Sequence, residues 1–133
     1  MDEPLNLVLF SGTDDKLQAA AVLTVGAAAM GRKVNLFLQY WALDAFRTGN
    51  LTKDHGVSPE AGPEGARIMA EQGKTHWSEL FAQAKDLGEI TINACADTME
   101  MFHITREDLD PMVDGVTGVA SFFLEATGPV TFI

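Results

Sequence analysis

The chain is poor in cysteine and in cations, and each shortage argues against particular functions. It has one cysteine, and nine Lys and Arg against nineteen Asp and Glu, so its formal net charge is −10. Binding of nucleic acid or of an anionic membrane surface needs clustered cations, and the sequence therefore predicts neither partner. One cysteine cannot form a disulfide within the chain, and three scattered His add no metal-ligand spacing, so no metal or other cofactor is expected.

The chain also lacks a long apolar run and a basic start. Its longest apolar candidate, residues 19–30, is shorter than the ~20 residues that span a bilayer. The opening Met1-Asp2-Glu3-Pro4 is acidic, whereas a signal peptide begins with basic residues. We therefore expect a cytoplasmic protein without membrane insertion, in a reducing compartment where a lone thiol stays free.

Short apolar runs alternate with helical patterns along the chain. This alternation predicts an α/β fold, with a mostly parallel sheet of about five strands and helices on both faces of a single three-layer domain over residues 1–133. Residues 48–65 contain four Gly and two Pro and predict a mobile loop. The strands are expected at 5–10, 34–39, 89–94, 113–116 and 130–133, and the helices at 14–30, 40–47, 75–87, 97–102 and 117–125.

The predicted helix 14–30 is apolar on nearly all sides. A helix with so little polar surface is usually buried on more than one side. In a domain of this size the pattern indicates a subunit interface, and hence a homo-oligomer.

The lone Cys95 follows the strand predicted at 89–94. Ligand sites in parallel sheets lie beyond the carboxyl ends of the strands, so we expect an exposed thiol at that edge. Free N–H groups at the start of the next helix favour the nucleophilic thiolate, although the charge of Asp97 opposes it. The residue six positions after Cys95 is Met101, not the Arg of a phosphatase loop, and there is no second cysteine for a thioredoxin-type pair. A Cys–His hydrolase would need an imidazole nearby, and His55 in the predicted loop is the first candidate.

The loop after the first strand supports an alternative function. Ser11, Gly12 and Thr13 resemble the flavodoxin phosphate loop, in which hydroxyl and N–H groups bind a phosphate. This would make the chain a flavin- or nucleotide-binding module that uses residues 11–15. Asp14 and Asp15 would repel a phosphate, however, so a turn that leads into a helix N-cap is the favoured interpretation.

Two segments give the chain a resemblance to the DsrE/DsrF-like family of small sulfur-transfer proteins. The first is the opening strand, followed by Ser-Gly-Thr-Asp-Asp and an alanine-rich helix. The second is Glu-Ile-Thr-Ile-Asn-Ala-Cys-Ala-Asp-Thr-Met-Glu-Met-Phe, which ends at Phe102. The stretches 104–109 and 115–122 also fit the family, and 48–74 matches it least.

The resemblance implies a cytoplasmic sulfur carrier or sulfurtransferase, acting catalytically or stoichiometrically. Cys95 would accept sulfane sulfur or a thiosulfonate group from thiosulfate, tetrathionate or a persulfide. It would then pass the group to the thiol of a TusA-like or rhodanese-like protein. Asp97, Thr98 and Met99 would shape the pocket, and the protein would assemble as a trimer or hexamer. Because one thiol cannot resolve a persulfide as a disulfide within the chain, transfer to a second protein suits this sequence.

Overall fold

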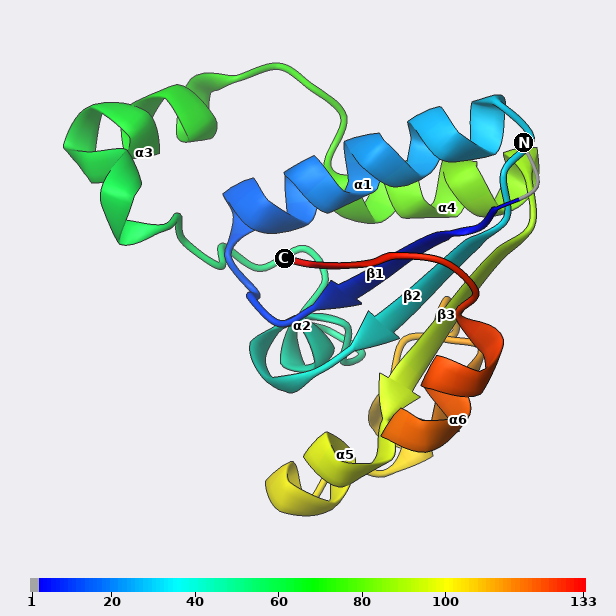
Figure 1. The fold of residues 1–133 in the computed structure, drawn as a ribbon. Helices are drawn as coiled ribbons and strands as arrows, with labels where there is room; N and C mark the ends of the chain where they lie inside the picture. Colours follow the sequence, from blue (N-terminus) through cyan, green and yellow to red (C-terminus); the bar gives the residue numbers. More distant parts are fainter. Residues whose placement is uncertain (1–2) are drawn as a thin grey trace.

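A five-stranded parallel sheet organises the chain, which the computed structural model describes over residues 3–133. The strand order is β4-β3-β2-β1-β5, and every neighbouring pair is parallel (Figure 1). The α/β fold expected from the sequence is therefore confirmed. The strands are β1 (Leu5–Leu9), β2 (Val34–Leu38), β3 (Ile90–Cys95), β4 (Gly115–Thr117) and β5 (Val130–Phe132).

Helices cover both faces of the sheet, as predicted. Helices α1 (Asp14–Ala29) and α4 (Trp77–Leu87) pack side by side on one face, which we call the front face (Figure 1). Helix α6 (Val119–Glu125) lies over the opposite, back face. Helices α2 (Tyr40–Ala45) and α5 (Ala96–Phe102) follow the carboxyl ends of β2 and β3. None of the helices formed by residues 3–133 is long and apolar enough to cross a membrane.

The main core fills the space between the front face and the helices α1 and α4. Alternate strand residues, such as Leu7, Leu36 and Ile92, point into it, because successive side chains of a strand lie on opposite faces. Trp77 and Phe81 of α4 are fully buried there. This front core is large and continuous, and it holds the sheet as a rigid base for the residues at its edge.

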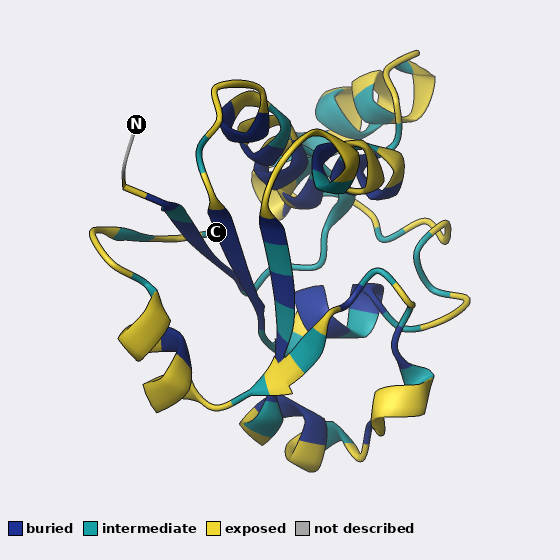
Figure 2. Ribbon diagram, turned by 90° about the vertical axis from the view of Figure 1, so that its right-hand side faces the viewer, coloured by how far each residue is buried: buried dark blue, intermediate teal, exposed yellow. Residues whose placement is uncertain are grey.

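The back face is covered by much less of the chain. Helix α6 has seven residues, of which only Phe122 is buried, and it appears almost wholly exposed in Figure 2. Beside it, the buried amides of Asn6 and Asn35 are hydrogen-bonded to each other at 2.9 Å. Asn6 also donates to the carbonyl oxygen of Thr127, 2.9 Å away, which ties the chain between α6 and β5 to the sheet.

Residues 48–65 contain turns and the 3₁₀ helix Pro59–Ala61, and they run into α3 (Gly62–Glu71). The sequence pattern does not predict α3. The reason is physical: two Gly and a Pro open the helix, and none of its residues is buried, so no core pattern marks it. It stands away from the sheet in Figure 1.

Two glycines allow a matched test of this packing. A Cβ on Gly12 would collide with the backbone carbonyl oxygen of Trp41, whereas a Cβ on Gly26, within α1, would meet no atom within 4 Å. We expect Gly12→Ala to lower the free energy of unfolding by about 2–3 kcal/mol, because the backbone must move. Gly26→Ala should raise it by about 0.5–1 kcal/mol through helix propensity. Urea denaturation of both variants checks this, and equal effects would contradict the packing.

Candidate functional site

Cys95 and Gln39 lie side by side at the carboxyl edge of the sheet. The β2–β3 register pairs Leu38 with Ala94, so the next residues along the two strands become neighbours. The side-chain amide of Gln39 donates a hydrogen bond to the Cys95 sulfur, with Nε2 3.8 Å from Sγ. No motif in the sequence marks Gln39 as a site residue. Its position directly after the second strand, at the same sheet edge as Cys95, is the signal that could have found it.

The thiol is buried, whereas its position in the sequence predicts an exposed one. Cys95 is 1% exposed and packs with Val8, Phe37 and Phe122. Strand alternation turns its side chain to the back face, where Phe122 of α6 covers it. The rings of Phe122 and Phe37 are stacked, with centroids 4.7 Å apart and planes 11° from parallel. The expectation failed because the sequence does not show which helix covers the back of the sheet.

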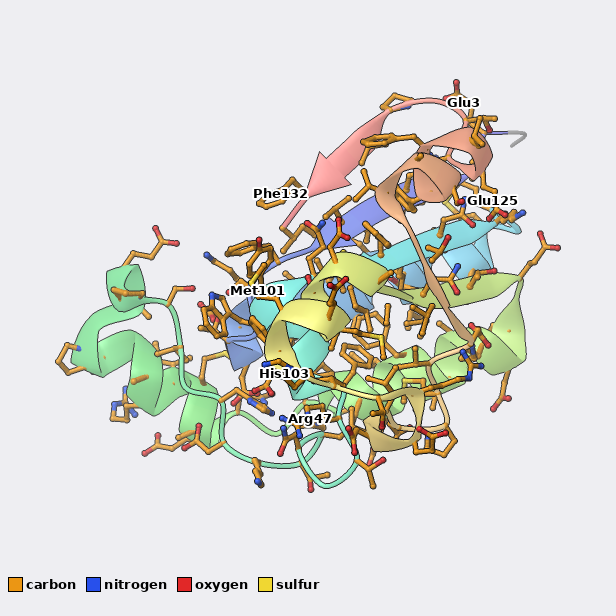
Figure 3. All side chains as sticks on the ribbon, turned by 90° about the horizontal axis from the view of Figure 1, so that it is seen from below. Glu3, Arg47, Met101, His103, Glu125 and Phe132 are labelled. Carbon is orange, nitrogen blue, oxygen red and sulfur yellow. The ribbon has the colours of Figure 1, made fainter. Side chains whose placement is uncertain are left out.

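A shallow groove of about 250 Å³ lies beside Gln39, the residue that is hydrogen-bonded to the thiol. Three residues of the buried cluster that contains Cys95 also line this groove, and so does its hydrogen-bond partner Gln39. Phe132, at the end of β5, is exposed and lines the groove; its position is labelled in Figure 3. The lining residues are Val8, Phe37, Gln39, Val119, Phe122, Phe123, Val130 and Phe132.

The residues after Cys95 point in different directions. Asp97 is exposed in the first turn of α5. Thr98 is buried, and its hydroxyl oxygen accepts a hydrogen bond from the Tyr40 amide at 3.3 Å, which ties α5 to the start of α2. Met99 packs into the front core. Because α5 has only seven residues and an acidic first turn, its backbone gives a thiolate little electrostatic support.

The first loop is engaged with the rest of the protein. The hydroxyl groups of Ser11 and Thr13 are hydrogen-bonded to each other at 3.3 Å, and the backbone of Gly12 packs against Trp41. The Asp14 amide, which begins α1, donates to the carbonyl oxygen of Gly56 at 2.9 Å. These contacts use hydroxyl and N–H groups that a bound phosphate would need.

Asp15 anchors the segment after His55 to the start of α1. Burial alone would raise the pKa of Asp15, but polar groups around its carboxylate, among them Thr13 and the backbone amide of Ser58, outweigh this effect. Together they hold the pKa below its usual 3.8. The backbone amide of Ser58 donates to the Asp15 carboxylate at 3.2 Å. The carboxylate therefore stabilises this part of the structure while it is charged.

His55 belongs to a different environment from Cys95. Its ring nitrogen Nε2 lies 2.6 Å from the Asn50 carbonyl oxygen, and its backbone amide donates to Asp14 at 3.0 Å. Asp14 in turn accepts a hydrogen bond from the indole of Trp77, which belongs to the front core. The structure thus places His55 by α1 and α4, and Cys95 on the back face. Among residues 3–133, no group of three or more His, Cys, Asp or Glu could hold a metal ion.

Comparison with known proteins identifies the first half of the chain. Residues 1–64 match the DsrE/DsrF/DrsH-like family. This segment, just under half of the chain, is DsrE-like. This match supports a role in sulfur metabolism and confirms the resemblance seen in the sequence. Cys95 lies beyond the matched residues, so the match assigns it no role.

Two individual proteins resemble this DsrE-like chain. The uncharacterised protein YrkE of Bacillus subtilis is 27% identical over 144 residues, which cover 90% of this chain and 89% of YrkE. The solved structure of MTH1491, a protein of unknown function from Methanobacterium thermoautotrophicum, is 16% identical. It matches 97% of each chain with a TM-score of 0.49.

The charge of Asp15 predicts a pH-dependent contribution to stability. Because its pKa is lowered by folding, the contribution is complete above about 3.8 and is lost as the pH falls through the folded-state pKa. Asp15→Asn should lower the free energy of unfolding by about 1 kcal/mol at pH 7, a modest amount because the carboxylate is partly exposed. Urea denaturation should show the difference shrinking at pH 3.

A matched control removes an exposed carboxylate from α4. Asp86→Asn should change the stability by less than about 0.5 kcal/mol at pH 7. An Asp15→Asn effect that stays constant down to pH 3 would contradict the role given to the charge of Asp15.

Proposed function

We propose that this DsrE-like protein is a cytoplasmic sulfur carrier or sulfurtransferase that holds sulfur covalently on Cys95. The observation that carries the proposal is the position of this thiol. It lies at the carboxyl edge of a parallel sheet, where such folds bind ligands, next to the Gln39 amide and one side chain from a groove. The family match over residues 1–64 supports sulfur chemistry in general.

The chemistry requires only thiol exchange. With tetrathionate as donor, the Cys95 thiolate attacks an inner sulfur, a new S–S bond forms to Sγ, and the central S–S bond breaks. Thiosulfate leaves with the electron pair, so Cys95 carries a thiosulfonate group and no external oxidant is needed. Thiosulfate and persulfides are the other candidate donors. The Gln39 N–H group would donate a hydrogen bond to the sulfur while it is anionic.

Release of the sulfur requires a second protein. The chain has no other cysteine to attack the adduct, so a thiol of a TusA-like or rhodanese-like partner would remove the group by the same exchange. The protein would act as a catalytic sulfurtransferase or as a stoichiometric carrier, according to how fast this partner turns it over.

A sulfur donor can reach the thiol only if helix α6, which covers it, moves locally. Only one residue of α6, Phe122, is buried, so displacing this helix disturbs far less apolar surface than opening the front core. Segments with few buried contacts open locally at a lower free energy than the whole domain unfolds. A buried thiol in this position can therefore react in the folded protein.

The first prediction from this proposal concerns the adduct. Incubation of the reduced protein with tetrathionate should add one group to Cys95, seen by mass spectrometry as a mass increase that reductant removes. Cys95→Ser should take up none, because the chain then has no thiol. The folded state of the variant is checked by circular dichroism. Uptake by Cys95→Ser, or wild-type labelling only in denaturant, would contradict the proposal.

The second prediction concerns assembly. Val22 and Leu23 of α1 are about half exposed although α1 packs on the sheet and α4, and we propose that they form part of a homo-oligomer interface. Light scattering should give three or six times the chain mass of 14.3 kDa. Leu23→Glu should reduce the mass, whereas Leu87→Glu, at the exposed end of α4, should not. A monomeric wild-type protein would contradict this proposal.

A further inference from the structure

The groove beside Cys95 has an almost entirely apolar lining. Seven of its eight lining residues are Val or Phe, the eighth is the uncharged Gln39, and none carries a charge. Three of them, Val8, Phe37 and Phe122, belong to the same buried cluster as Cys95. A molecule that approaches the sulfur from this groove therefore leaves water for a hydrocarbon surface with one amide to hydrogen-bond.

No cation compensates for this apolar lining. Arg106 donates to the carbonyl oxygen of Asp114, and Lys85 is paired with the carboxylate of the same residue at 2.6 Å. Neither of these cations lines the groove. The chain as a whole has a net charge of −10, which repels anions at long range. Transfer of an anion into such a groove has a desolvation cost that no ion pair offsets. An uncharged molecule does not carry this cost.

We propose that this groove admits uncharged polysulfanes, which are chains of sulfur without an anionic group, in preference to anionic donors such as tetrathionate. This inference rests on the proposed function and names its class of substrate. Phe122 shares the buried cluster of Cys95, Gln39 donates to Sγ, and both residues line the groove, so their displacement would open a path from the groove to the thiol.

The reaction with a dialkyl trisulfide, R–S–S–S–R, is a single exchange. The Cys95 thiolate attacks the central sulfur, a bond forms between Sγ and that atom, and one of its two S–S bonds breaks. An alkyl thiolate leaves with the electron pair, so the central sulfur stays on the protein as Cys–S–S–S–R. The step consumes no oxidant or reductant and leaves one transferable sulfur on the protein.

The test compares two donors on two thiols. The rates at which dimethyl trisulfide and tetrathionate modify Cys95 are measured by mass spectrometry, and each is divided by the rate with free N-acetylcysteine, which corrects for intrinsic reactivity. The corrected rate should be at least tenfold higher for dimethyl trisulfide than for tetrathionate. Equal corrected rates, or a preference for tetrathionate, would overturn the inference and leave the proposed function intact.

Two substitutions on α6 separate the effect of the groove on the donor preference from the effect of the net charge. Val119 lines the groove and is 38% exposed, whereas Leu124 is 83% exposed and does not line it. Val119→Lys should raise the corrected rate of tetrathionate at least fivefold, because it puts a cation at the groove. Leu124→Lys adds the same charge to the same helix and should change the preference less than twofold. Equal effects of the two variants would show that net charge, not the groove, sets the preference, and would overturn the inference.

The same measurements also distinguish a failure of the substrate preference from a failure of the proposed function. If neither donor modifies Cys95 in the folded protein while both do in urea, the proposed function fails, and the inference fails with it. If both modify the folded protein, the function survives and the ratio of corrected rates decides the inference.

Discussion

The stacking of Phe122 on Phe37 is the contact on which the chemistry of this protein depends. It holds the short helix α6 against the back of the sheet and covers Cys95. The same two rings form the wall of the apolar groove. The front core, with Trp77 and Phe81, is large enough to keep the sheet rigid without this contact. This aromatic pair therefore forms part of the cover of the thiol, while the fold itself rests on other residues.

This arrangement suits a carrier of reactive sulfur. A persulfide or polysulfane on an open thiol would exchange quickly with any small thiol in a reducing compartment. In the proposed function, Phe122 would shield the adduct, which would react only when α6 moves or a partner displaces it. As a consequence, the thiol that carries no sulfur is also inaccessible. In our account, local opening of the back face sets the rate of both loading and release.

The amino-acid pattern predicts the parts of the structure that depend on local signals. The buried strand before Cys95, the apolar stripe of α4 and the alanine-rich α1 follow from periodicity, and their alternation leads to a parallel sheet with helices on both faces. Helix α3 buries no residue and was missed. Burial of the thiol was missed because Phe122 meets Cys95 only through tertiary packing. His55 is a candidate partner of the thiol by chemical type alone, whereas the fold sets its ring beside Trp77.

The account can be tested most directly through the reactivity of Cys95 in increasing urea. The rate at which N-ethylmaleimide labels this thiol reports the opening that exposes it, and the urea dependence of the rate measures how much surface that opening uncovers. We predict a rate that is nearly independent of urea at low concentrations, because only α6 and its neighbours move. A rate that rises from the start with the full slope of global unfolding would mean that the thiol reacts only in the unfolded chain, and the account would be wrong.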